Sequence, residues 1–154
     1  SYPIVGTVDI SMVTTEKIWV CTCGYGKIYA TSDGGENWQL QFDDTSLTSC
    51  MNYIEMFDSL NGVAMGDAPI GSNKPALFLR TTDGGNNWIS MNQNYLLGLF
   101  SGDLWRRVDF VDMNTGYFFS SGESPKKLYK TTRVVNDCFF TTQKTQVYMP
   151  IIPP

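Results

Sequence analysis

An eight-residue phrase occurs twice in the chain with two substitutions between the copies, at positions that differ by 50 residues. Residues 31–38 read Thr-Ser-Asp-Gly-Gly-Glu-Asn-Trp, and residues 81–88 read Thr-Thr-Asp-Gly-Gly-Asn-Asn-Trp. Each copy follows a short segment in which apolar and polar residues alternate, which is the pattern of a β-strand. A phrase that returns at a fixed offset indicates that the chain is a series of similar structural units.

A third unit follows after another 50 residues, although its copy of the phrase has changed. Residues 127–132 align with the two earlier strands, but Arg133, Val135 and Cys138 replace the acid, the second glycine and the tryptophan. We therefore expect a different turn in this unit. The upstream segments also repeat, so each unit reads as four short strands joined by turns. The predicted units span residues 8–42, 52–91 and 106–142.

The repeated phrase is explained by the chemistry of a tight turn between the third and fourth strands. The carboxylate of Asp33 or Asp83 can accept backbone N–H groups that the turn leaves unpaired. The second glycine adopts positive φ at little steric cost, the threonine adds a hydroxyl contact, and the tryptophan buries its ring between sheets and needs one partner for its N–H. A calcium loop needs alternating oxygen ligands, which residues 33–36 lack. The expected turn residues are Thr31, Asp33, Gly35, Trp38, Thr81, Asp83, Gly85 and Trp88.

The pattern [Ser/Thr]-x-Asp-x-Gly-x-x-Trp after a strand resembles the Asp-box, or BNR, repeat of β-propeller proteins. With Leu-Phe-Leu-Arg before the phrase and Gly-Val-Ala-Met-Gly-Asp upstream, the second unit is most similar to the photosystem II stability/assembly-factor family and its secreted bacterial relatives. The resemblance covers residues 8–142. It implies an all-β fold of three four-stranded antiparallel sheets, each a propeller blade of about 50 residues. Propellers typically have about four to eight blades, so three blades form an incomplete ring.

An incomplete ring leaves exposed edges at its first and last blades. Three arrangements could cover them. The chain could be a fragment of a longer protein, copies could associate through their open edges, or residues 145–149 could add a strand. Residues 143–154 are otherwise expected to form an extended tail, because its prolines disfavour a helix.

Charge and composition narrow the classes of function. Histidine is absent, which removes the most common general base and metal ligand. Residues 1–100 hold ten acidic and four basic residues, a net charge of −6, and residues 101–154 hold five and seven, a net charge of +2. A chain that is acidic as a whole is a poor match for nucleic acid, whose phosphates require a basic surface. We predict no metal, no cofactor and no nucleic-acid partner, and the apolar stretches are too short to predict a membrane span.

The four cysteines, Cys21, Cys23, Cys50 and Cys138, leave three interpretations open. Cys21 and Cys23 lie two apart on a predicted strand, so their side chains point to the same face and do not bridge each other. Buried free thiols are the preferred interpretation, and one disulfide is the second. A metal site is the least favoured, because zinc sites use two spaced pairs of ligands.

The loops that join second and third strands share one face of a propeller with the links between blades. Rigid scaffolds commonly present binding residues on such loops. The link from residue 92 to residue 105 contains an apolar run at 95–100, which requires either burial over the gap between blades or a partner. The candidate partner-binding residues are Tyr25, Asp67, Tyr95, Leu97, Phe100 and Trp105.

The sequence favours a non-enzymatic interaction or assembly module that is exported to the extracellular space or the periplasm and binds an unidentified protein or glycan. One alternative is a fragment of an Asp-box glycoside hydrolase. A sialidase needs an arginine cluster and an early Arg-Ile-Pro-like motif, which is absent here, while a xyloglucanase needs two carboxylates on different blades. Asp67 and Asp109 are the nearest candidates for those carboxylates. Another alternative is a structural subunit of a polymer. We predict no catalytic residues.

Overall fold

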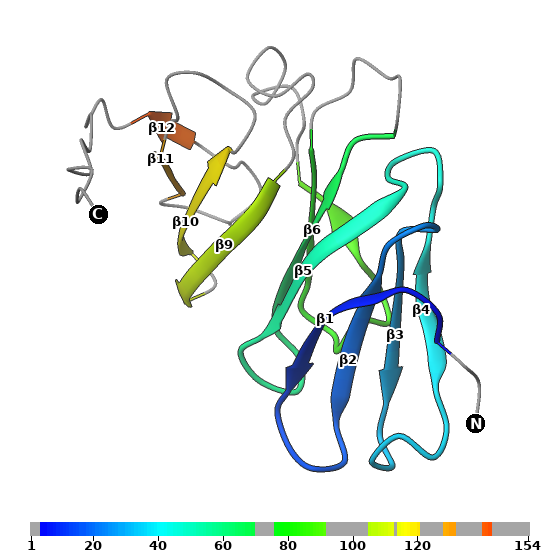
Figure 1. Ribbon diagram of the computed structural model, residues 1–154. Helices are drawn as coiled ribbons and strands as arrows, with labels where there is room; N and C mark the ends of the chain where they lie inside the picture. The colour runs from blue at the N-terminus through cyan, green and yellow to red at the C-terminus, as the bar shows by residue number, and fades with distance from the viewer. Residues whose placement is uncertain are drawn as a thin grey trace, which may run out of the picture.

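The computed structural model describes residues 4–69, 76–91, 105–112, 114–120, 128–131 and 140–142 (Figure 1). Side chains are described at residues 4–69, 76–91, 108–112 and 114–117. The predictions for the apolar run, the third turn and the tail lie outside these ranges. They concern Tyr95, Leu97, Phe100, Arg133, Val135, Cys138 and residues 143–154.

The described ranges hold twelve β-strands, arranged in three sheets of four. Blade 1 comprises β1 (Thr7–Met12), β2 (Ile18–Thr22), β3 (Lys27–Thr31) and β4 (Gln39–Asp43). Blade 2 comprises β5 (Cys50–Met56), β6 (Gly62–Asp67), β7 (Leu77–Thr81) and β8 (Ile89–Ser90). Blade 3 comprises β9 (Trp105–Asp112), β10 (Thr115–Ser120), β11 (Leu128–Thr131) and β12 (Phe140–Thr142). Neighbouring strands are antiparallel and follow the order of the sequence, so the predicted all-β blade architecture is confirmed.

The strand register shows which residues are equivalent in the three blades. Thr31, Thr81 and Thr131 each pair with the first or second residue of the preceding strand in their blade. The third unit therefore keeps its strand position although it has lost the Asp-box phrase, and β12 still pairs with β11. The same comparison places Ile10, Ile54 and Val108 at one position of the first strands, and Met12, Met56 and Phe110 at another.

The first strands of the three blades lie side by side. Figure 1 shows β1, β5 and β9 in front of the rest of their sheets, while β4 and β12 lie toward opposite outer ends of the molecule. Strand β5 contacts both β1 and β9. This arrangement is a sector of a propeller, with the first strands on the inside and the blades fanning outward.

The core is divided into two layers, one at each junction between neighbouring blades. Alternate residues of a strand point to opposite faces, so blade 2 contributes one set of side chains to each layer. The junction of blades 1 and 2 buries Trp19, Cys21, Ile28, Ala30, Met51, Ile54, Met56, Ala64, Leu77 and Leu79. The junction of blades 2 and 3 buries Val63, Met65, Ala76, Phe78, Val108 and Phe110.

Candidate functional site

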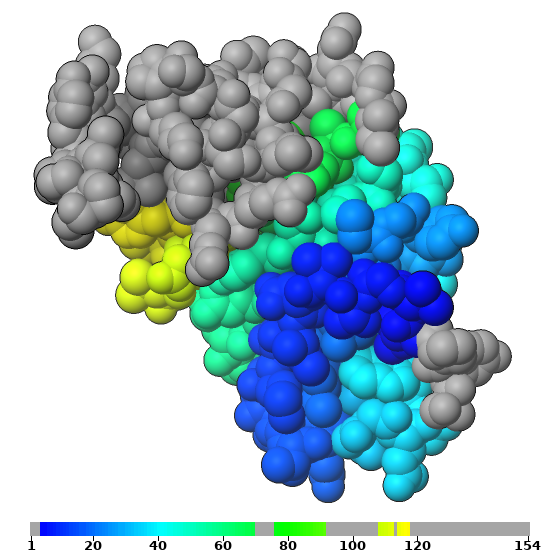
Figure 2. Space-filling model, in the orientation of Figure 1, coloured from blue at the N-terminus to red at the C-terminus, as the bar shows by residue number. Residues whose placement is uncertain are grey.

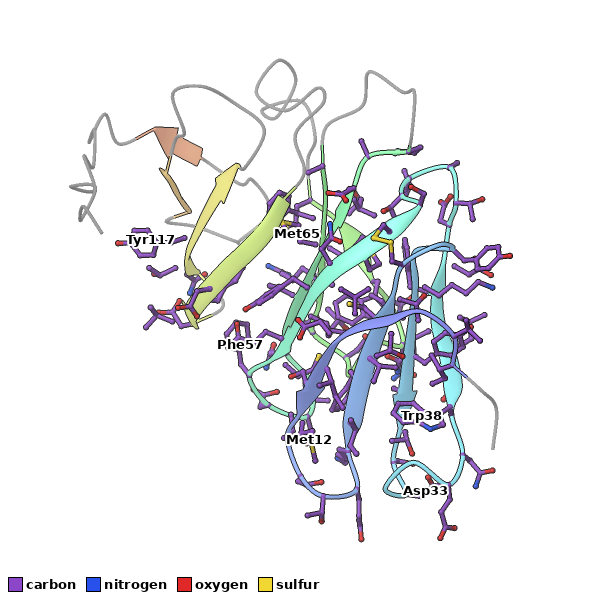
Figure 3. The ribbon with its side chains drawn as sticks, in the orientation of Figure 1. Met12, Asp33, Trp38, Phe57, Met65 and Tyr117 are labelled. Atoms are coloured by element: carbon purple, nitrogen blue, oxygen red, sulfur yellow. A yellow bond between two sulfur atoms is a disulfide. The ribbon has the colours of Figure 1, made fainter. Side chains whose placement is uncertain are left out.

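The Asp-box turn of blade 1 closes on the side chain of Asp33. Its Oδ1 atom accepts the backbone N–H of Asn37 at 2.9 Å and the hydroxyl of Thr31 at 2.6 Å, and its Oδ2 atom accepts the side-chain amide of Asn37 at 2.8 Å. The Thr31 oxygen accepts the backbone N–H of Gly35 at 3.1 Å. The bond from the Asn37 backbone, followed by those from the two side chains, lowers the pKa of Asp33 to about 2. Figure 3 shows Asp33 at the end of the blade.

The turn of blade 2 repeats this geometry. Asp83 accepts the hydroxyl of Thr81 at 2.9 Å, the backbone N–H of Asn87 at 2.9 Å and the side-chain amide of Asn87 at 2.7 Å. The Asn87 side chain makes the largest contribution to lowering the pKa of Asp83. Gly35 and Gly85 have φ values of 97° and 84°, in the left-handed region that favours glycine. Both oxygens of each carboxylate are therefore engaged within their own turn.

The two box tryptophans differ in their surroundings. The indole N–H of Trp38 donates to the carbonyl of Gly35 at 3.1 Å. Trp88 packs against the core of the first junction, and its buried indole N–H has no hydrogen-bond partner within the described part of the chain, contrary to our expectation. The Trp88 ring therefore contributes apolar contact area to the first junction.

A groove of about 440 Å³ lies between the two Asp-box turns, and it was not predicted from the sequence. At one side, the carbonyl of Gly84 accepts two hydrogen bonds from blade 1, from the Gln41 amide at 2.9 Å and from the Trp19 indole at 3.3 Å. The groove is also lined by Trp38 and by the two box aspartates. Both carboxylates already accept hydrogen bonds within their own turns, so they contribute to the groove as walls that are held in place.

The cysteines form a disulfide between Cys23 and Cys50, which corrects our preference for free thiols. The strand β2 ends at Thr22, so Cys23 begins the following loop and lies beside Cys50 at the start of β5. Cys21, two residues earlier, is a fully buried free thiol in the first junction. The disulfide is consistent with an oxidising compartment.

Two of the six candidate partner-binding residues have described side chains. Tyr25 lies in the β2–β3 loop with 67% of its surface exposed, and the Lys27 ammonium lies 5.8 Å from its ring centroid. Asp67 ends β6, is partly buried, and its backbone carbonyl accepts the Thr48 hydroxyl at 2.6 Å. Trp105 begins β9, but its side chain lies outside the described residues, as do Tyr95, Leu97 and Phe100.

Polar side chains of β1 hold the first strand of the next blade. Asp9 accepts the backbone N–H of Ile54 at 3.0 Å, and Ser11 accepts that of Met56 at 2.8 Å. Sequence reasoning missed these contacts, although Ser11 occupies the same position as Glu55 and Asp109.

At the second junction, Glu55 occupies the position of Ser11 and likewise accepts a backbone N–H from the first strand of the next blade. Its carboxylate accepts the backbone N–H of Phe110 and the hydroxyl of Tyr53. Burial raises the pKa of Glu55 above its usual range, and the negative charges of Asp109 and Asp9 raise it further, although the two hydrogen bonds oppose this shift. Burial also raises the pKa of the Tyr53 hydroxyl.

The two proposed glycosidase carboxylates lie on different blades. Asp67 is at the loop end of β6, whereas Asp109 is exposed in the middle of β9, close enough to Glu55 and Tyr53 to affect their pKa values. Among the described residues, no group of three or more Cys, Asp or Glu side chains is placed to hold a metal ion. The same residues contain no helix that is long and apolar enough to cross a membrane.

The sequence matches no protein-family model and no curated protein, but the fold matches solved structures. A structure of YCF48 bound to D1 peptide has a TM-score of 0.64 and 17% identity, over 89% of this chain and 40% of that one. YCF48 from Cyanidioschyzon merolae has a TM-score of 0.56 and 17% identity, over 92% and 47%. The GH74 enzyme of Niastella koreensis has a TM-score of 0.62 and 15% identity, over 89% and 22%.

These matches confirm the expected likeness to Asp-box propellers at the level of the fold. The chain spans less than half the length of each of these proteins, so it corresponds to part of a propeller. The matches include a protein in complex with a peptide and an enzyme, and a shared fold does not choose between such functions.

Proposed function

We propose that this chain is a non-enzymatic interaction module, exported to the extracellular space or the periplasm, whose loop face on blades 1 and 2 binds a protein partner. The observation that carries the proposal is the exposed ring of Tyr25 on a rigidly held loop. Aromatic side chains that are fixed before binding are the typical energetic centres of protein interfaces, because little conformational freedom is lost when they are buried.

The loop of Tyr25 is fixed at several points. The Cys23–Cys50 disulfide links it to blade 2, and the backbone N–H groups of Cys23 and Gly24 donate to the carbonyls of Gly6 at 2.8 Å and Ser49 at 3.0 Å. On the other side of Tyr25, Gly26 packs so closely on the fully buried Thr48 that a Cβ atom would lie 2.8 Å from its methyl group. The residues on both sides of Tyr25 are thereby tied to neighbouring segments of the chain.

Two further observations support the proposal, namely the hydrogen bonds that engage the carboxylates and the likeness to known structures. Asp33, Asp83 and Glu55 are engaged in hydrogen bonds within their turns or across a junction, which favours a non-enzymatic role. A YCF48 structure of similar fold contains a bound peptide. The disulfide supports export, because such bonds persist in oxidising compartments.

The test is selection of peptide ligands from a random displayed library on the folded 154-residue chain. We expect selected peptides to bind the Tyr25→Ser variant at least about tenfold more weakly, because the variant removes the aromatic anchor. The matched control is Leu60→Ser, which truncates another exposed apolar residue in the β5–β6 turn and leaves binding unchanged. Failure to enrich any peptide, or equal binding to both variants, would overturn the proposal.

A non-enzymatic role also requires that the purified chain does not hydrolyse xyloglucan or aryl sialosides. Turnover of either substrate that is lost in Asp67→Asn or Asp109→Asn would instead establish the glycosidase alternative.

A further inference from the structure

The groove between the two Asp-box turns is built by blades 1 and 2 alone. Every residue that lines it lies between Lys17 and Asn86. Its volume of about 440 Å³ falls within the range of about 300–1,000 Å³ that is usual for sites of small ligands. In Figure 1 the Asp-box turn of blade 1 is at the lower end of the blade and the β2–β3 loop is at the upper end, and Figure 2 shows the lower end, in blue and cyan, at the surface.

The walls of the groove are fixed by hydrogen bonds within the chain. The Trp19 indole and the Gln41 amide both donate to the carbonyl of Gly84, so they tie the wall on blade 1 to the wall on blade 2. Asp33 and Asp83 are held within their own turns. A ligand that enters the groove therefore orders few protein groups, which lowers the cost of binding.

Blade 1 differs from blade 2 at the positions that face the groove. The strand register makes Trp19 equivalent to Val63, and it makes Gln39 equivalent to Ile89. Because blade 2 forms the same sheet with aliphatic residues at both positions, the blade architecture does not require an indole or an amide there. The polar groups of blade 1 at these positions are features of the groove.

A β-bulge in β4 adds a third difference. Leu40 and Phe42 pair with consecutive residues of β3, so Gln41 between them is the additional residue of the bulge. In blade 2, the paired residues of β8 are consecutive on both strands. Bulges commonly redirect a side chain next to a functional site, and here the redirected amide of Gln41 reaches across the groove to Gly84.

The remaining side chains define the chemistry of the groove. Hydroxyl and amide groups, which both donate and accept hydrogen bonds, are supplied by Ser32, Gln39, Ser59 and Asn86. Leu60 adds an apolar rim, with 56% of its surface exposed.

The charges of the groove argue against an anionic ligand. Its lining residues include one base, Lys17, and two acids, Asp33 and Asp83, which give a formal charge of −1. Both carboxyl groups have a lowered pKa and stay ionised at neutral pH. Phosphate, sulfate and uronate groups would be repelled, whereas a neutral ligand would not.

We propose that the groove binds a neutral oligosaccharide. A sugar ring carries hydroxyl groups around its edge, which both donate and accept hydrogen bonds, and C–H groups on its faces, which pack on apolar side chains. In this site the hydroxyl groups bond to Gln39, Ser59 and Asn86, and a face of the ring packs on Leu60. The site lies at the opposite end of β3 from the loop of Tyr25, so it is separate from the proposed protein-binding face.

The test is titration calorimetry of the folded 154-residue chain with neutral oligosaccharides of glucose, xylose, mannose or N-acetylglucosamine, and with oligogalacturonate as the anionic comparison. We expect binding to at least one neutral series and none to oligogalacturonate. Gln39→Ala and Leu60→Ser each weaken binding by about threefold to tenfold, because one removes a hydrogen-bonding amide and the other an apolar contact. Both changed residues are exposed, and circular dichroism checks that the fold is retained. The matched control is Leu40→Ala, the next residue along β4, which is 46% exposed, does not line the groove and leaves binding unchanged.

Two variants separate this site from the loop of Tyr25. Leu60→Ser weakens oligosaccharide binding and leaves peptide binding unchanged, whereas Tyr25→Ser does the reverse. The absence of binding to every neutral series, a preference for oligogalacturonate, or equal binding by wild type, Gln39→Ala and Leu60→Ser would each overturn the oligosaccharide site, and none of these results bears on the binding of peptides at Tyr25.

Discussion

The two junctions between blades share a plan and differ in how they are held. The first junction combines packing of aliphatic and sulfur-containing side chains around Trp19 with cross-links, which are the Cys23–Cys50 disulfide and the two hydrogen bonds accepted by the Gly84 carbonyl. The second junction relies on aromatic packing, in which the Phe110 ring lies 6.2 Å from that of Tyr53 and 6.3 Å from that of Phe57. Within the described residues, we see a disulfide at the first junction only.

The comparison shows that equivalent strand positions make the same kind of contact at both junctions, although the residue types at those positions differ. Ser11 and Glu55 accept a backbone N–H at the same place, although one is neutral and the other ionisable. Similarly, Gly116 leaves room for Phe110, since a Cβ atom would lie 2.5 Å from the ring. A repeat can therefore change its side chains as long as each junction still fills its space and pairs its buried polar groups.

Removing the central ring of the second junction should have the largest effect. Phe110→Ala is expected to lower the free energy of unfolding by about 3–5 kcal/mol, because the ring is only 7% exposed and its loss leaves a cavity. Urea unfolding followed by tryptophan fluorescence measures the change. Val111→Ala, the neighbouring exposed residue on the same strand, should change the free energy by less than about 0.5 kcal/mol. Equal effects of the two variants would contradict the assignment of Phe110 to the core.

Removing the disulfide of the first junction should lower the free energy of unfolding somewhat less than Phe110→Ala does. The double change Cys23→Ser, Cys50→Ser is expected to lower the free energy of unfolding by about 2–4 kcal/mol, because the bond spans 27 residues and restricts the unfolded chain. Urea unfolding with and without a reductant measures the contribution. The variant should be insensitive to reductant, whereas the wild-type midpoint should fall to that of the variant. A wild-type midpoint that ignores the reductant would count against the disulfide.

The smallest expected effect is a dependence of stability on pH, which distinguishes the acceptor Glu55 from the acceptor Ser11. The pKa of Glu55 is raised in the folded chain, so its favourable contribution is complete below the pKa of the unfolded chain and is lost as pH rises through the folded pKa. Glu55→Gln cannot titrate, and its stability relative to wild type should improve from pH 4 toward neutrality. The improvement should stay below about 1 kcal/mol, because solvent screens a partly exposed carboxylate. Chemical unfolding at several pH values measures it, with Ser11→Ala as the control that should show a loss independent of pH.

The strands and the Asp-box turns could be predicted because their signals are local. Asp33 and Asp83 bond to residues within four positions, so the repeated phrase contains donor and acceptor together. The alternating segments likewise carry their own pattern. The same logic predicted the strand at Leu128–Thr131, which forms without the phrase.

The contacts between blades could not be predicted in the same way. The pairing of Cys23 with Cys50 depends on where β2 ends, and a shift of one residue would have turned Cys23 away from Cys50. The repeated position of Ser11, Glu55 and Asp109 is visible in the sequence, but its meaning depends on which face the next blade covers. The Gly84 carbonyl gives no sequence signal, because its two donors come from residues 43 and 65 positions away.

The disulfide has a free thiol for a neighbour, because Cys21 lies two residues before Cys23. Packing of β5 against blade 1 leaves Cys21 fully buried, and this burial, together with the charge of Asp9, raises the pKa of Cys21 to about 12. A protonated thiol is a poor nucleophile toward a disulfide, so the interface that the disulfide links also keeps Cys21 in the form that does not exchange with the Cys23–Cys50 bond.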